Sequence, residues 1–269
     1  MVNSLFDLSG RVALVSGAAS GFGRAIALGL AEFGADLMLA DLNAEGVQQT
    51  AAEIEQMGRR AVPEACDVTD FDQIRTLYER LDQAYGRIDI LANVAGPAVA
   101  GSPEEIAIED VQKTIQWLVV SRFYCCQQGG RRMLAAGKGS IINIGSLASI
   151  TALGRGHIAY SMAMGAVAQM TRELSTEWSS RGVRVNAILP GQVPTPNNRL
   201  YERMAADPNL RNFFLRGIPI GRLGVSDDIK GLAVLLASDA SSWITGALIP
   251  LDGGNLAKNA GGSHPGMPV

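Results

Sequence analysis

Three glycines lie where a short apolar run gives way to an amphipathic one, in "VALVSGAASGFGRAIALGLAEFGA". Gly17, Gly21 and Gly23 would let the backbone turn tightly and approach a pyrophosphate, which the N-terminus of the following helix would stabilise. The hydroxyl of Ser20 can add a hydrogen bond there. Close packing of a helix on a strand also favours glycine, so this motif alone leaves a purely structural interpretation open.

Asp41 ends the second apolar run, at the expected spacing of about 20 residues after the glycines. A carboxylate in this position accepts hydrogen bonds from both ribose hydroxyls and repels a 2′-phosphate. No Arg or Lys stands next to it, since its neighbours are Ala40 and Leu42. The sequence therefore predicts NAD rather than NADP. An Asp that only capped a turn would not require the glycines upstream, so the two features together are more specific than either alone.

The elements that must position these residues are visible as alternating patterns. Seven short, nearly continuous apolar runs are typical of strands covered on both faces: 11–16, 35–41, 60–68, 88–96, 139–146, 183–191 and 247–254. Amphipathic segments typical of helices lie between them, at 21–34, 44–58, 70–85 and 159–181. This alternation predicts an α/β fold: a single-domain, Rossmann-type, doubly wound parallel sheet of about seven strands with helices on both faces.

The domain is expected to span residues 1–254, followed by a Gly/Pro-rich C-terminal tail at 255–269 that is free or packs on a neighbouring subunit. A net charge of −3 gives no field for nucleic acid or an anionic membrane. We find no secretory signal and no apolar stretch near the ~18 residues of a membrane span. The three cysteines, Cys66, Cys125 and Cys126, lack metal spacing, and the adjacent Cys125 and Cys126 are expected to be reduced, half-buried packing residues on one helix. We therefore expect a cytoplasmic protein without a metal site.

From about Leu8 to Gly254 the chain resembles the short-chain dehydrogenase/reductase family. The pattern Gly17-x-x-x-Gly21-x-Gly23 is similar to that family's dinucleotide loop, and "CDVTD", "NVAG", "PGQVPT", "GRLG" and "LDGG" match further signatures. The resemblance implies cofactor contacts by Ser20, Phe22, Asp67, Val68, Asn93, Ala95, Gly96, Pro190, Gly191, Val193 and Thr195. It also implies a homotetramer or dimer.

The same resemblance implies a hydride-transfer site. In the family a Tyr exchanges the proton and a Ser binds the substrate oxygen. A Lys four residues after the Tyr binds the nicotinamide ribose and lowers the Tyr pKa, and an Asn on the preceding long helix holds a water of the proton relay. Ser146 and Tyr160 match the first two residues, but Met164 stands at the Lys position and Leu118 aligns with the Asn. A thioether supplies no charge, and losing a general base commonly costs ~10²–10⁴ in rate.

Two loop residues could compensate. His157 could relay a proton and Arg155 could hold a carboxylate or phosphate, although a solvated loop is the favoured interpretation. Residues 192–216 are expected to form the lid over the cleft. Their mixture of aromatic and arginine side chains suits an aromatic or acyl substrate with an anionic end.

Two functions follow from these residues. The favoured one is a non-catalytic or impaired NAD-binding subunit of an NAD-dependent hydroxyl/ketone oxidoreductase complex, as a homo- or hetero-oligomer whose active partner is an intact chain of the same family. The alternative is an active NAD-dependent alcohol dehydrogenase that uses Ser146 and Tyr160 with an altered proton relay. A third class, a lyase or dehydratase with NAD as a scaffold, has no specific support.

Overall fold

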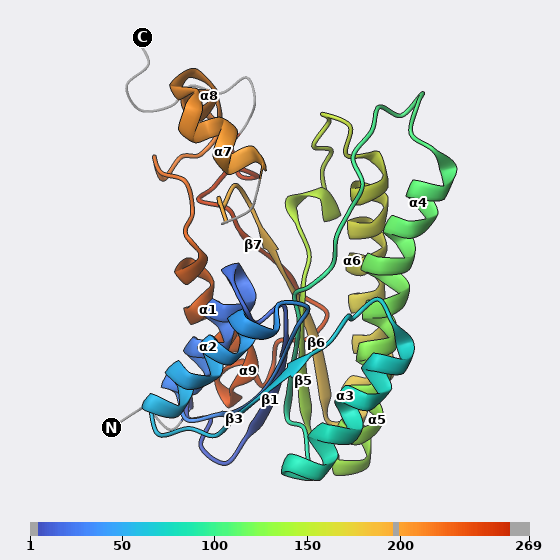
Figure 1. Ribbon diagram of the computed structural model, residues 1–269, viewed down its shortest axis with the longest axis vertical. Helices are drawn as coiled ribbons and strands as arrows, with labels where there is room; N and C mark the ends of the chain where they lie inside the picture. The colour runs from blue at the N-terminus through green and yellow to red at the C-terminus, as the bar shows by residue number, and fades with distance from the viewer. Residues whose placement is uncertain (1–4, 196–198, 259–269) are drawn as a thin grey trace.

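In the computed structural model, which describes residues 5–195 and 199–258, the apolar runs form a parallel sheet. Its strands are β1 (Val12–Ser16), β2 (Asp36–Asp41), β3 (Ala61–Ala65), β4 (Ile90–Asn93), β5 (Gly139–Ile144), β6 (Val183–Pro190) and β7 (Leu248–Leu251). The strand order is β3-β2-β1-β4-β5-β6-β7, and every neighbouring pair is parallel (Figure 1). The prediction of a doubly wound, Rossmann-type sheet is confirmed.

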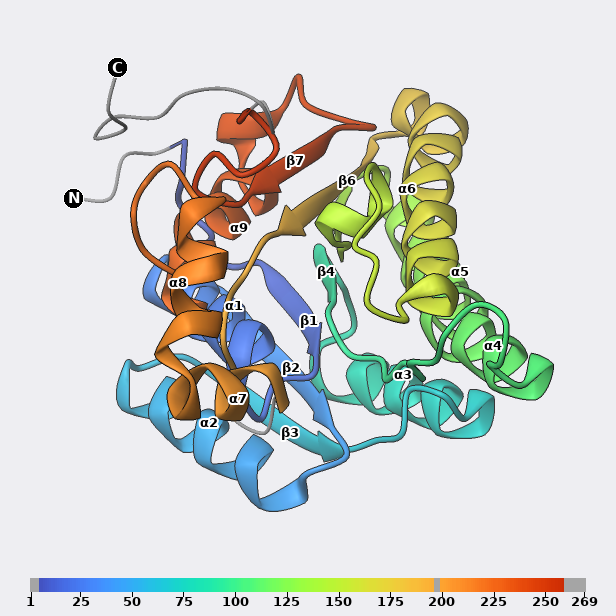
Figure 2. The ribbon, with the colours of Figure 1, turned by 90° about the horizontal axis from the view of Figure 1, so that it is seen from above.

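Helices cover both faces of this sheet. They are α1 (Gly21–Glu32), α2 (Ala44–Gln56), α3 (Phe71–Tyr85), α4 (Ile108–Ile115), α5 (Ser121–Ala136), α6 (Ile158–Trp178), α7 (Arg199–Ala206), α8 (Pro208–Arg216) and α9 (Lys230–Ala237). Figures 1 and 2 place α1, α2 and α9 on one face, and α3, α5 and α6 on the other. No helix in the described part of the chain is both long and apolar enough to cross a membrane.

The strands are apolar throughout because both of their faces are buried. Ala13 and Val15 of β1 pack into the cluster beneath α1, α2 and α9. Leu14, between them, points the other way into the cluster beneath α3, α5 and α6. All three cysteines are free and buried, so the expectation of half-buried side chains for Cys125 and Cys126 was wrong. Cys125 and Cys126 lie on the inner face of α5, where they pack into the cluster beneath α3, α5 and α6.

Helices α4 and α5 follow each other without a loop and are joined by a π-helical turn at Gln116–Val120. Leu118 lies in the middle of this turn and is buried. Single π turns of this kind occur frequently at functional sites, because the extra residue re-aims side chains toward a neighbouring element. Here the turn precedes α5, which packs against β4 and β5.

The order of the strands determines where a ligand can bind. Strand β1 pairs with β2 on one side and with β4 on the other, so the chain changes direction at this point of the sheet. In open α/β sheets the crevice outside the carboxyl ends of such strands is the usual binding site. Above this edge lie α7 and α8, the helices of the segment expected to be a lid (Figure 2). Of the expected tail, residues 259–269 lie outside the described residues.

Candidate active site

The glycine loop joins β1 to α1 and has the backbone that its sequence predicts. Gly17 and Gly21 adopt φ values of +70° and +54°, which disfavour side chains with a Cβ atom. A Cβ atom at Gly23 would overlap the carbonyl oxygen of Gly17, so α1 can approach the loop only with glycine there. Ser20 precedes α1 with extended backbone, and its side chain makes no capping hydrogen bond to the helix. The first N–H groups of α1 and the Ser20 hydroxyl thus remain open to a pyrophosphate.

Asp41 both shapes the loops and ends β2 next to the glycines. Its Oδ2 accepts a hydrogen bond from the Ala19 N–H at 3.0 Å, and its Oδ1 accepts one from the Asn43 N–H at 2.9 Å. Each carboxylate oxygen retains a lone pair for a further donor. The structural role and the ribose-binding role weighed from the sequence are therefore compatible in the same side chain.

A cavity of about 200 Å³ lies beside Asp41 at the ends of β1, β2 and β4. Among its lining residues are four that the family resemblance predicted as cofactor contacts, Asp67, Val68, Ala95 and Gly96. Asn93 does not line it: this side chain is buried and donates to the Asn143 Oδ1 at 3.0 Å, which links β4 to β5. The sequence reasoning missed others that line the cavity: Leu42, Cys66, Thr69, Pro97 and Trp117.

A second cavity, of about 340 Å³, brings the two predicted catalytic residues together. Ser146 follows β5, and its hydroxyl accepts a hydrogen bond from the Ala148 N–H at 3.2 Å. Tyr160 lies on the first turn of α6. The same walls include the predicted cofactor contacts Phe22, Gly96, Pro190, Gly191, Val193 and Thr195. Because Gly96 lines both cavities, the two adjoin, and one elongated ligand could extend from Asp41 to Tyr160.

Leu118 and Met164 form an apolar wall of this second cavity. Their side chains are 2% and 1% exposed and belong to one hydrophobic cluster, against which Tyr160 packs. Leu118 also lies against Gly96, where a Cβ atom would be only 2.5 Å from the Leu118 Cδ2. The two positions that the family resemblance assigns to a relay therefore pack together as hydrophobic core.

Arg122 is a charged residue of the second cavity that the sequence reasoning also missed. It lines the second cavity with Tyr160 and Met164, and only 5% of its surface is exposed. Its Nη1 donates to the Ile144 carbonyl at 2.6 Å, and its Nη2 donates to the Ala95 carbonyl at 3.4 Å. Burial lowers the pKa of Arg122 from its usual value, and Cys126 and Tyr160 oppose this effect. Its position one helical turn after Leu118 was the available signal, since residues i and i+4 share a face.

Arg155 and His157 lie in the loop before α6 and do not line either cavity. Arg155 has a φ of 57°, in the left-handed region, and its guanidinium lies 5.1 Å from the centroid of the Phe214 ring on α8. The His157 ring lies edge-on to Tyr160 at 6.2 Å between centroids. Burial, and then the charge of Arg155, lower the pKa of His157. Arg155 is exposed and His157 is half-buried, and the contact of Arg155 with Phe214 lies between this loop and α8.

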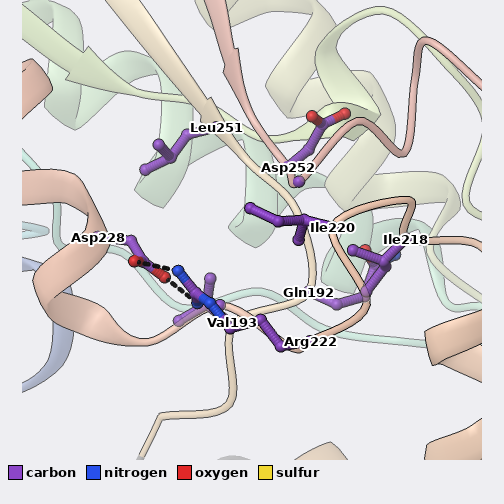
Figure 3. A pocket seen from close by; sticks show the side chains of 10 residues that line it. Gln192, Val193, Ile218, Ile220, Arg222, Asp228, Leu251 and Asp252 are labelled. Carbon is purple, nitrogen blue, oxygen red and sulfur yellow. Dashed lines mark hydrogen bonds and ion pairs between the residues drawn. The ribbon is translucent and has the colours of Figure 1, made fainter.

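A third cavity, of about 210 Å³, adjoins the second through Val193, which lines both. Figure 3 shows its side chains, drawn from the ends of β6 and β7 and the segment after α8. Arg222 is paired with Asp228 at 2.7 Å, and this pairing lowers the pKa of Asp228. The Gln192 Oε1 is buried without a hydrogen-bond partner among the described residues. This mostly apolar space widens the cleft on the side of the lid.

Residues 17–255 match the family model described as enoyl-(acyl carrier protein) reductase. Over 255 residues the chain is 40% identical to D-threitol dehydrogenase of Mycolicibacterium smegmatis, covering 94% of this chain and 95% of that protein. It is 38% identical over 259 residues to 2-dehydro-3-deoxy-D-gluconate 5-dehydrogenase of Pseudoalteromonas atlantica, and the match covers 94% of this chain and 98% of that protein.

Among solved structures, the chain is similar to gluconate 5-dehydrogenase from Burkholderia cenocepacia in complex with NADP and tartrate. The TM-score is 0.88 with 31% identity, over 95% of this chain and 99% of that one. The chain therefore belongs to the short-chain dehydrogenase/reductase family, as its motifs predicted.

Proposed function

We propose that this chain is an active, NAD-dependent dehydrogenase that interconverts a hydroxyl and a ketone on a small polyhydroxy compound. The observation that carries the proposal is the cavity in which Ser146 and Tyr160 meet the cofactor-side residues Phe22 and Thr195. The substrate class is supported by the relatives, whose names specify threitol and gluconate derivatives. It replaces the aromatic or acyl substrate that the composition of the lid favoured.

The residues present fit a dinucleotide. Gly23 leaves room for α1 to approach the loop, and the two adjoining cavities extend from Asp41 to Tyr160. When bound, the cofactor supplies the acceptor for the hydride that leaves the carbinol carbon. Asp41 supports NAD, because its carboxylate would face the 2′ position, where a phosphate would be repelled. The similar gluconate 5-dehydrogenase structure contains NADP, so the two cofactors are compared directly in the test below.

The protein's own groups would handle the proton. The Ser146 hydroxyl lies on the cavity wall, where it can donate to the substrate oxygen. Tyr160 would accept the hydroxyl proton as the carbonyl forms, and would return it in the reverse direction. The packing of Tyr160 against the Leu118–Met164 cluster restricts its motion and keeps water from one side of the ring.

The test combines binding with turnover. Calorimetry should show tighter binding of NAD than of NADP, and the purified chain should oxidise at least one polyol or sugar acid from a panel of threitol, glycerol and gluconate. Tyr160→Phe should lower kcat by ~10²–10⁴ while leaving cofactor binding in place. Tighter binding of NADP would refute the Asp41 argument.

A second candidate, the non-catalytic subunit, is supported by the apolar Leu118–Met164 wall, which lacks the polar groups of the family's relay. Under this proposal the purified chain binds NAD but turns over nothing. Co-expression with an intact chain of the same family would then yield a stable mixed oligomer. Turnover by a homogeneous preparation that Tyr160→Phe abolishes would exclude this candidate.

A further inference from the structure

Arg122 places a positive charge where the proposed function has not yet used one. The side chain belongs to α5, directly after the π turn, and its guanidinium lies at the carboxyl ends of β4 and β5. It shares the wall of the second cavity with Ser146, Tyr160 and Met164. Among the described residues that line this cavity, Arg122 is the one that carries a positive charge.

The hydrogen bonds of Arg122 are incomplete. A guanidinium carries five N–H donors, and the structure gives this one two acceptors, the carbonyls of Ala95 and Ile144. Its Nε is buried and has no hydrogen-bond partner among the described residues. A buried charge with unused donors is costly, and an apolar residue would pack there at lower cost. The cost is understandable if a ligand oxygen completes the set of acceptors.

We propose that Arg122 is a cofactor-binding residue that donates hydrogen bonds to the hydroxyls of the nicotinamide-side ribose. It would take over this contact from the family's lysine, whose position is occupied by Met164 in this chain. The inference rests on the proposed dinucleotide site. It explains how Met164 and Leu118 can be apolar core while the cavity keeps its cation. The cation of this cavity would then be supplied by α5 and not by α6.

A purely structural role is the competing explanation, because Arg122 bridges two carbonyls at strand ends. The chain contains a matched control in Arg184, at the other end of the sheet. Its Nη2 donates to the carbonyls of Leu236 and Ser238 at 2.8 and 3.2 Å, and burial lowers its pKa as well. Arg184 lines neither of the two cavities assigned to the dinucleotide, so Arg184→Met removes a carbonyl-bridging arginine without touching the proposed contact.

The experiment measures the affinities of ADP and ADP-ribose by calorimetry, since only the latter carries the second ribose. In the unmodified chain ADP-ribose should bind at least about tenfold more tightly than ADP. Arg122→Met should weaken ADP-ribose about ten- to a hundredfold, the worth of one or two charge-assisted hydrogen bonds, and leave ADP unchanged. Arg184→Met should change the affinity of neither ligand. Arg122→Lys should retain part of the tighter binding of ADP-ribose over ADP.

The decisive variant moves the charge back. Arg122→Met combined with Met164→Lys should restore the tighter binding of ADP-ribose over ADP. Equal affinities of the two ligands in the unmodified chain would overturn the proposal, and this measurement holds even if Arg122→Met does not fold. An unchanged ADP-ribose affinity in a folded Arg122→Met variant would overturn it too. The binding test does not depend on turnover. A chain that is inactive in the turnover assay would refute the proposed reaction, and the role of Arg122 in binding would still be tested by the ligand affinities.

Discussion

At the scale of single residues, the site is defined by which side chains are buried together. Met164 packs at 1% exposure in an apolar cluster, while Arg122 carries the charge of the same cavity. A second cation in this cavity would be repelled by the first and would lose its hydration. Whether position 164 can hold a cationic side chain therefore depends on residue 122, although the two residues lie on different helices.

We expect Met164→Lys alone to destabilise the protein without ligand by on the order of 3 kcal/mol, whereas Met164→Leu should cost less than about 1.5 kcal/mol. Burial and Arg122 both disfavour the ammonium, so the folded protein should bind a proton there less readily than the unfolded chain. The deficit should therefore shrink as the pH rises from 7 to 10. Thermal and urea unfolding across this range measure it. A deficit that does not depend on pH would show that the new lysine reaches solvent.

The cysteines provide a second residue-scale prediction. Burial raises the pKa of Cys66 to about 12, with smaller effects from Glu64 and Asp67. At pH 8 only about one part in 10⁴ of such a thiol is the reactive thiolate. We expect a disulfide reagent to label almost none of the three cysteines in the folded protein within minutes, and all three in guanidinium. Rapid native labelling, abolished by Cys66→Ser, would place that thiol in contact with solvent.

At the scale of elements, glycines determine how closely helices approach the site. In the glycine loop between β1 and α1, Gly23 lets α1 pack directly against Gly17. Gly165 on α6 faces open space, and no atom lies within 4 Å of the position that a Cβ atom would take. The first glycine is required by a contact, while the second costs conformational entropy without a packing reason.

The two alanine substitutions should therefore have opposite effects. Gly23→Ala should destabilise by ~1–3 kcal/mol through overpacking and weaken NADH binding at least about tenfold. Gly165→Ala should stabilise by ~0.5–1 kcal/mol, because alanine favours the helix and restricts the unfolded chain. Denaturant midpoints and NADH titrations measure both effects. A destabilised Gly165→Ala variant would mean that a second copy of the chain packs at that position.

At the scale of the whole molecule, one flank of the fold exposes apolar side chains. Helices α4, α5 and α6 form this flank together with the π turn (Figure 2). The exposed apolar residues on it are Ile108, Val120, Phe123, Ile158 and Met162. A chain that exposes several large apolar residues on neighbouring helices is a candidate for association.

We expect light scattering after size exclusion to give a mass that is a multiple of the 28.4 kDa chain. Phe123→Glu combined with Met162→Glu should lower that mass, because charges would be buried in the interface. Met57→Glu, at an exposed position beside α2, should leave it unchanged. A monomer at micromolar concentration would favour the hetero-oligomer and direct the search toward an intact partner chain.

The sequence by itself determined the strands, the glycine loop between β1 and α1, and four of the nine α-helices in the described residues, α1, α2, α3 and α6. These depend on local properties: apolar runs buried on two faces, helical periodicity, and glycines whose backbone other residues rarely adopt. It also identified Ser146, Tyr160 and Asp41, which the structure places at the carboxyl edge of the sheet. The burial of Arg122 in the cavity wall was decided only by the tertiary structure. Its acceptors, Ala95 and Ile144, lie far from it and from each other along the chain, and they meet only when β4 and β5 pair beside α5. An arginine within a helix does not reveal that it is buried, because its burial depends on the elements that pack around it.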